Sequence, residues 1–262
     1  MAFGLIIIGD EILSGRRSDK HLPKVIELLG ERGLQLAWAE IVGDDPARIT
    51  ALLKRSFAGP DIVFSCGGIG ATPDDHTRQC AAAALGVPLE LHPEGKLLVQ
   101  ERIRETAREA GREPDLDAPE NLQRLRMAEF PAGAGIIPNP YNRIPGFTVH
   151  RHHFVPGFPV MAWPMIAWVL DSCYRELFHR EAHVERSLLV YEQAEAALTP
   201  LMERLEAEHA GVNVFSLPSV GDENTRRHIE LGVKGAPELV ASAFAEMCKA
   251  LDRLGAEYRA LE

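Results

Sequence analysis

The sequence predicts an α/β fold, in which a three-layer, doubly wound and mostly parallel sheet is followed by a small α+β domain. Two observations lead to this prediction. Short apolar runs of the buried-strand type alternate with segments of helical spacing from the N-terminus onward. After about residue 181 the order changes to strand, helix, two strands and a helix. We therefore expect one domain at residues 1–180 and another at residues 181–262.

The first domain opens with three strand–helix repeats. Apolar runs predict strands at residues 5–8, 34–42 and 62–65. Helical spacing and start signals predict the helices that follow them at residues 19–29, 46–57 and 73–85. Such alternation favours a parallel sheet with both faces covered by helices. Helices around residues 94–110 and 120–127, and extended pieces at residues 135–137, 147–149 and 153–155, are expected to complete the domain.

The second domain has a smaller pattern of its own. Its expected elements are a strand at residues 187–191, a helix at 193–209, strands at 212–217 and 228–233, and a helix at 237–254. Apolar side chains repeat at helical spacing along the last of these helices. This β-α-β-β-α order predicts a small α/β sandwich.

Composition narrows the partners. The 262 residues carry 28 basic and 38 acidic side chains, a net charge of −10, which argues against a nucleic-acid platform because such surfaces are basic. No apolar run approaches the ~20 residues that span a bilayer, so no membrane partner is expected. The four cysteines form no CxxC pair, and the N-terminus runs directly into the first strand. We therefore expect a cytoplasmic protein with reduced thiols.

The most informative motif is Gly67-Gly68-Ile69-Gly70, which lies between a predicted strand and a predicted helix. A glycine turn before a helix N-terminus presents unpaired backbone N–H groups and favours anions such as phosphate. The adjacent carboxylates Asp74 and Asp75 would repel a phosphate unless a cation such as Mg²⁺ lies between them. Capping is the alternative: Thr72 as N-cap and Asp75 at N3 resemble a capping box, which needs no ligand.

Carboxylates follow two other predicted strands in the same way. Asp10 and Glu11 follow the first strand, and Asp44 and Asp45 follow the second. In an open parallel sheet these positions meet at one edge, where ligands bind. Asp45 alone is explained as the N-cap of the helix that begins at Pro46, but capping does not explain all three pairs.

Together these segments resemble the molybdopterin-binding domain of the MoaB/Mog type, and most of all the N-terminal domain of the competence/damage-inducible protein A (CinA) family. The likeness spans roughly residues 3–178 and includes residues 9–15, 42–45, 67–77, 126–128, 131, 137–140, 145–147 and 154–159. Residues 141–144 depart from the family's pattern, so recognition of the ligand's organic half stays open. No segment resembles the family's C-terminal amidase domain, so deamidation is not expected. The second domain is similar to the KH-like spacer of CinA proteins.

The resemblance and the motif chemistry together imply a site. Catalysis and metal binding are assigned to Asp44 and Asp75. Ligand or phosphate contacts are assigned to Gly9, Asp10, Glu11, Gly67, Gly68, Gly70, Thr72, Asp74, Thr77, Pro156 and Gly157. The expected cofactor is a divalent metal such as Mg²⁺, and molybdopterin is a further candidate ligand.

Two functions follow from this site. One is a metal-dependent pyrophosphatase that acts on nucleotide diphosphates of the ADP-ribose type, as the CinA-type domain implies. The other is a molybdopterin-binding protein or molybdenum cofactor biosynthesis transferase, with or without turnover. In both, the partner is a small phosphorylated molecule. We also expect a homo-oligomer, with the second domain as the interaction module.

The histidines His150, His152 and His153 raise a separate alternative. In an extended segment His150 and His152 would share a face and could bind a metal. We favour surface imidazoles at a hairpin instead.

Overall fold

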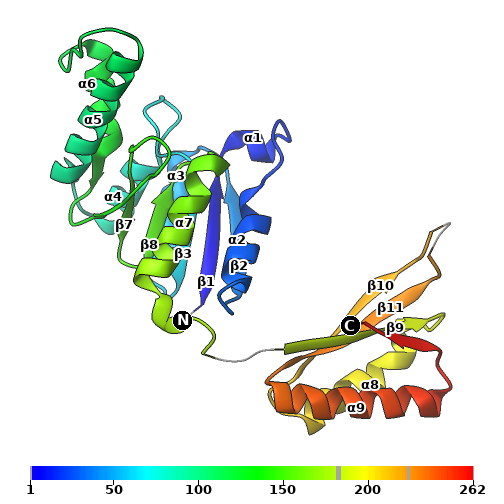
Figure 1. The fold of residues 1–262 in the computed structure, drawn as a ribbon. Helices are drawn as coiled ribbons and strands as arrows, with labels where there is room; N and C mark the ends of the chain where they lie inside the picture. Colours follow the sequence, from blue (N-terminus) through cyan, green and yellow to red (C-terminus); the bar gives the residue numbers. More distant parts are fainter. Residues whose placement is uncertain (1, 181–183, 223–224, 262) are drawn as a thin grey trace. The chain divides into compact units, whose positions relative to one another are not determined.

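The computed structural model describes residues 2–180, 184–222 and 225–261. The chain divides into two compact units, Met1–Phe178 and His179–Glu262, and each is described by itself (Figure 1). Of the helices formed by the described residues, none combines the length and the apolar character needed to cross a bilayer.

A six-stranded sheet forms the centre of the first unit. Its strand order is β2 (Leu36–Val42), β1 (Phe3–Ile8), β3 (Ile62–Cys66), β8 (His152–Val155), β7 (Gly146–Val149) and β6 (Gly135–Ile137). The first four strands are parallel. Strand β7 pairs with β8 in antiparallel orientation, and β6 pairs with β7 in the same way. This confirms the predicted mostly parallel sheet.

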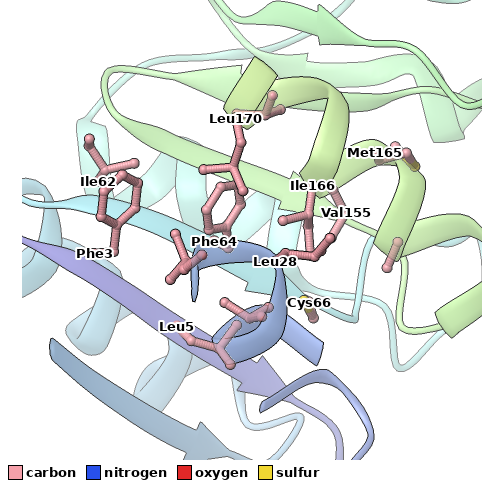
Figure 2. Packing of buried hydrophobic residues seen from close by; sticks show 14 of the residues in the cluster. Phe3, Leu5, Leu28, Ile62, Phe64, Cys66, Val155, Met165, Ile166 and Leu170 are labelled. Atoms are coloured by element: carbon pink, nitrogen blue, oxygen red, sulfur yellow. The ribbon is translucent and has the colours of Figure 1, made fainter. Parts of the chain in front are cut away.

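Helices cover both faces of this sheet, so β1 is buried on both sides. Leu5 and Ile7 pack with α2 (His21–Gly30) and α7 (Pro159–Cys173), in the cluster that Figure 2 shows around Phe64, Leu28 and Ile166. Ile6 and Ile8 point to the opposite face, toward α3 (Pro46–Phe57) and α4 (Thr77–Leu85). Alternation of side chains along a strand produces this division.

Some details differ from the predictions. The helix expected at residues 73–85 begins four residues later, at Thr77, and residues 72–76 form turns. A short helix, α1 (Asp10–Leu13), follows β1, and α7 had no counterpart among the predicted elements. The favoured interpretation of the histidines was wrong for His152 and His153, which are buried in β8, whereas His150 is exposed at the preceding turn.

A small lobe extends from the first unit (Figure 1). It contains the two-stranded sheet of β4 (Leu89–Leu91) and β5 (Glu129–Pro131), the helices α5 (Pro93–Glu109) and α6 (Pro119–Leu125), and a 3₁₀ turn, η1 (Arg126–Ala128). Val99 and Ile103 of α5 pack against Ala128 to form its small core. A second 3₁₀ turn, η2 (Arg175–Leu177), follows α7.

The second unit is a four-stranded antiparallel sheet with two helices. The strand order is β10 (Asn213–Ser219), β11 (His228–Gly235), β9 (Val184–Tyr191) and β12 (Tyr258–Ala260). The helices are α8 (Glu195–Glu208) and α9 (Pro237–Leu254). The β-α-β-β-α order is as predicted, and β12 is an addition. The run Gly232-Val233-Lys234-Gly235 has the Gly-x-x-G spacing of nucleic-acid-binding KH loops, but it lies inside strand β11.

Candidate functional site

A cavity of about 390 Å³ opens at the carboxyl ends of β3 and β8. One wall is the glycine loop that follows β3, from Gly68 to Thr72, together with Asp75. Segment 156–158, which follows β8, forms a second wall. This is the edge of a parallel sheet at which ligands bind in α/β proteins.

The carbonyl groups of the glycine loop are held by the protein behind it. Thr77 donates from Oγ1 to the Gly67 carbonyl, 3.0 Å away, and from its backbone N–H to the Gly68 carbonyl, also 3.0 Å away. The buried guanidinium of Arg78 donates to the Gly70 carbonyl at 2.5 Å. Gln123 donates to the Ala71 carbonyl at 3.0 Å. Four anchors, on the carbonyls of residues 67, 68, 70 and 71, therefore fix the orientation of these peptide planes.

The backbone N–H groups of the loop face the other way as a result. In a trans peptide the N–H points opposite to the carbonyl of the same plane, and no peptide bond described is cis. The N–H groups of Gly68, Ile69 and Ala71 belong to planes whose carbonyls are anchored behind the loop. Within the described part of the chain, none of these three donates to a protein acceptor. Such a row of N–H groups is a site for an anion.

Two glycines are required by the close packing of this loop. Gly67 (φ 109°) lies over the carbonyl of Ile8, and Gly68 (φ 67°) lies over Oγ1 of Thr77, so that a Cβ at either position would collide. Both conformations are ones that residues with a side chain rarely adopt. The glycines are therefore needed to build the loop, whether or not a ligand binds.

Asp75 stabilises the turn that Thr72 begins. Its Oδ2 accepts hydrogen bonds from the backbone N–H of Thr72, at 2.9 Å, and from the Thr72 hydroxyl, at 2.5 Å. The Asp75 N–H donates in return to the Thr72 carbonyl at 3.0 Å. Of the two bonds of a capping box, only the one from the Thr72 N–H to the Asp75 carboxylate is present, because the Asp75 N–H bonds the Thr72 carbonyl and not its hydroxyl, and the helix begins only at Thr77. The carboxylate also lies against Gly70 and lines the cavity. It therefore stabilises the turn and is at the same time accessible from the cavity.

The carboxylates that follow β1 and β2 form a second group. The Asp10 N–H donates to Asp44 Oδ2 at 2.9 Å, and the Asp44 N–H donates to Asp10 Oδ1 at 3.2 Å. Partial burial raises the pKa of Asp44, and the negative charges of Asp10, Glu11 and Asp74 raise it further. Asp74 therefore links the glycine-loop segment electrostatically to Asp44.

The donor chemistry of this group suits a hard cation. All the charged groups are carboxylates, which Mg²⁺ and similar ions prefer. Among residues 2–180, 184–222 and 225–261, no three His, Cys, Asp or Glu side chains are placed to hold a metal ion by themselves. A cation here would need further ligands from a bound phosphate and from water, which is how proteins commonly bind Mg²⁺.

The structure separates the predicted site residues into three groups. The cavity is lined by Gly68, Gly70, Thr72, Asp75, Pro156 and Gly157. Around the Asp10–Asp44 pair lie Glu11 and Asp74, and Gly9 donates to the Val42 carbonyl at 3.0 Å. Gly67 and Thr77 are buried behind the loop.

Sequence reasoning missed the remaining wall of the cavity. That wall is formed mainly by apolar or amide side chains: Met127, Asn139, Asn142, Ile144, Pro145, Phe158 and Met161. Four of them, Met127, Asn139, Pro145 and Phe158, belong to segments that carried the family resemblance, which was the one available signal. Apolar residues have no chemistry that distinguishes a ligand pocket from the protein core.

Comparison with known proteins identifies the family. Residues 4–177 match the family model described as "Probable molybdopterin binding domain". The chain belongs to this molybdopterin-binding domain family. This match and the similarities to the relatives described below confirm the predicted MoaB/Mog-type, CinA-like character.

Two CinA-like proteins illustrate the relationship. The chain is 33% identical over 219 residues to one from Anaeromyxobacter dehalogenans, covering 81% of this chain and 51% of the relative. It is 29% identical over 269 residues to one from Gloeobacter violaceus, covering 97% of this chain and 59% of the relative. The chain thus spans between half and three fifths of the length of these relatives.

A solved structure shares the fold. It is the crystal structure of the protein CinA, of unknown function, from Thermoplasma acidophilum, with a TM-score of 0.55 and 24% sequence identity. The match covers 65% of this chain and 98% of that one. This likeness supports the architecture of the first unit.

Proposed function

We propose that this member of the molybdopterin-binding domain family is a metal-dependent pyrophosphatase for nucleoside diphosphate derivatives of the ADP-ribose type. One observation carries the proposal: the N–H groups of Gly68, Ile69 and Ala71 face away from the anchored carbonyls of a loop that lines the cavity. An anion is the ligand that such donors bind best. A diphosphate would extend from this loop toward the carboxylates of β1 and β2.

The carboxylates define the role of a cation. A negative ligand beside Asp75, Asp44 and Asp74 would be repelled unless a positive charge lay between them. Asp75 and Asp44 are the residues that we assign to hold Mg²⁺, and the ion would neutralise charge on the diphosphate.

The reaction is the addition of water to one phosphorus atom of the diphosphate. The bridging P–O bond breaks, and ADP-ribose yields two monophosphates. We assign Asp44 to orient the water and accept its proton; partial burial raises the pKa of its carboxylate, which makes it a stronger base. The loop N–H groups would stabilise charge that develops on the phosphoryl oxygens.

A second candidate is binding of molybdopterin or its adenylylated form, without turnover. The family match over residues 4–177 favours it, because the matched model is one for molybdopterin binding. Molybdopterin carries a phosphate, so the same loop would hold it. The two candidates differ in whether a diphosphate is cleaved.

The test combines turnover and binding on matched variants. Hydrolysis of ADP-ribose, FAD and NAD is measured with Mg²⁺, Mn²⁺ or Co²⁺ and with a chelator, and binding is measured by calorimetry. We expect Asp75→Asn and Asp44→Asn to abolish hydrolysis and to weaken Mg²⁺-dependent binding strongly. Asn retains most capping ability, so we expect a stability loss of no more than about 1 kcal/mol.

Asp45→Asn is the matched control. Asp45 caps α3 by accepting from the Arg48 N–H at 2.7 Å, and it is not assigned to the site. Its substitution should leave hydrolysis unchanged. If Asp75→Asn hydrolyses ADP-ribose at the wild-type rate, Asp75 is only a cap and the metal mechanism is wrong. Metal-independent binding of a pterin phosphate with no hydrolysis of any diphosphate would favour the second candidate.

A further inference from the structure

The wall of the cavity that faces the glycine loop has its own chemistry. Ile144, Phe158 and Met161 give it an apolar surface, and Asn139 and Asn142 add two amides. Among the described residues, those that line the cavity include no basic side chain. This wall would suit the uncharged, planar part of a ligand better than its phosphates.

The two amides have different tasks. Asn139 is almost completely buried and uses both its N–H groups, to Asn142 Oδ1 at 2.8 Å and to the Ile144 carbonyl at 2.9 Å. Its Oδ1 accepts from the Tyr141 N–H at 3.0 Å. Asn139 therefore holds the loop of residues 139–144 together, and it has no N–H left to offer a ligand.

Asn142 does have spare donor capacity. Its Oδ1 accepts from Asn139 and from the Ile144 N–H, which is 3.0 Å away, so the orientation of its amide is fixed. Its Nδ2 donates, within the described residues, only to Met161 Sδ at 3.3 Å. A thioether is a weak acceptor, and both Asn142 and Met161 line the cavity. A ligand oxygen or ring nitrogen would be a better partner for this N–H.

The loop is also held from outside the cavity. Arg143, the residue after Asn142, has a left-handed backbone (φ 64°). Its Nε bonds Glu105 Oε1 of α5 at 2.7 Å, and its Nη1 lies 3.6 Å from Glu101 Oε2 of the same helix. Asn142 is therefore presented by a loop that is fixed on both sides before any ligand arrives. Such preorganisation reduces the entropy cost of binding.

We propose that Asn142 is a specificity-determining residue that donates a hydrogen bond from Nδ2 to an acceptor on a planar heteroaromatic ring. This inference rests on the proposed function, because it assumes that the glycine loop holds the phosphates of the same ligand. The ring lies against Phe158, an aromatic side chain that is 54% exposed at the cavity. Nucleobases and pterins share this chemistry, since both are flat, uncharged and carry ring acceptors.

Asn142→Asp is the decisive variant, because it keeps the Oδ acceptor for Asn139 and Ile144 and removes the donor. Tyr141→Asp is the control for added charge, since Tyr141 is exposed and does not line the cavity. Calorimetry with Mg²⁺ compares three probes: ADP, neopterin monophosphate and inorganic pyrophosphate. We expect Asn142→Asp to weaken a ring-bearing probe about tenfold or more, and pyrophosphate no more than Tyr141→Asp does.

Each outcome decides the inference. Loss for ADP alone identifies a nucleobase, and loss for the pterin alone identifies a pterin; both support it. Equal loss for pyrophosphate and the ring-bearing probes, or no loss for either ring, overturns it while the proposed phosphate site stands. If the wild-type protein binds none of the probes, the proposed function fails and this inference fails with it. Asn142→Ala, checked by its melting temperature, repeats the test without a new charge.

Discussion

At the scale of single residues, the phosphate loop depends on contacts behind it as much as on the space in front of it. The Thr77 side chain bonds the Gly67 carbonyl and occupies the position where a Gly68 Cβ would lie. A substitution at Gly68 would therefore displace the Thr77 hydroxyl and turn the peptide planes of the loop. Loss of ligand binding would follow from this distortion, even if the added side chain never met the ligand.

Gly68→Ala tests this reasoning, with Gly86→Ala as its control. Gly86, at the end of α4, has nearly the same backbone conformation (φ 70°) but no atom near its Cβ position. We expect Gly86→Ala to cost about 1 kcal/mol of unfolding free energy, the cost of a left-handed backbone, and to leave pyrophosphate binding unchanged. Gly68→Ala should cost about 1–3 kcal/mol more and abolish binding. Equal melting temperatures for the two variants, or intact binding in Gly68→Ala, would contradict the proposed packing.

At the scale of elements, the sequence predicted the strands better than it predicted some helices. Strands β1 and β3 are almost entirely apolar, because both faces of a central parallel strand are buried, whereas the edge strand β2 alternates between more and less exposed side chains. The start of α4 was misplaced because Thr72, Pro73 and Asp75 have the residue pattern of a capping box, but their hydrogen bonds close a turn ahead of the helix. Helix α7 was missed because it is apolar on most sides and contains Pro164.

The same limits apply to the candidate site. The glycines and carboxylates could be found because anion and cation binding require particular residue types at strand ends. The anchoring of the loop by Arg78 and Gln123 could not, since both bonds join residues that are distant in the sequence. The role of Asn142 depends on which of its atoms are already bonded, and only the structure gives that.

Strand β8 makes stability depend on pH through its two buried histidines. Burial lowers the pKa of His152 to about 4 and that of His153 to about 3. The charge of His150 also lowers the pKa of His152, and the charge of His152 lowers that of His153. In the unfolded chain both titrate near 6.5. Between these values the unfolded state binds more protons, so the unfolding free energy is greatest above about pH 6.5 and falls as the pH drops toward 3.

His153→Gln should reduce this dependence. The imidazole of His153 bonds Thr148 Oγ1 at 2.9 Å and the Tyr174 hydroxyl at 2.7 Å, and Gln can replace part of this network without titrating in this range. We expect lower stability at pH 7 but a slope between pH 6 and 4 that is smaller by up to about 1.4 kcal/mol per pH unit. Chemical denaturation across this range measures it. His150→Gln, at the exposed turn, is the control, and an equal change of slope in both variants would refute the assignment.

At the scale of the whole molecule, each of the two units has its own buried core. The core of the first unit lies on both faces of its central sheet, and that of the second lies between its sheet and helices α8 and α9. Every residue that lines the proposed ligand cavity belongs to the first unit. The sequence assigned the phosphate chemistry to the first domain and interaction to the second, and this division leads to a direct test.

We expect a chain that ends at Phe178 to fold and to bind pyrophosphate within about twofold of the full-length affinity, because 178 residues with a core on both sheet faces are enough for an independent domain. We further expect the full chain to be a homo-oligomer and the shortened chain to be smaller in subunit number, since the second domain is the predicted interaction module. Calorimetry measures the first expectation, and light scattering at matched concentrations measures the second. A shortened chain that keeps the full-length subunit number would show that the first unit alone makes the interface. A folded shortened chain that no longer binds pyrophosphate would mean that the second unit completes the site, and the assignment of ligand binding to residues 67–161 would then be wrong.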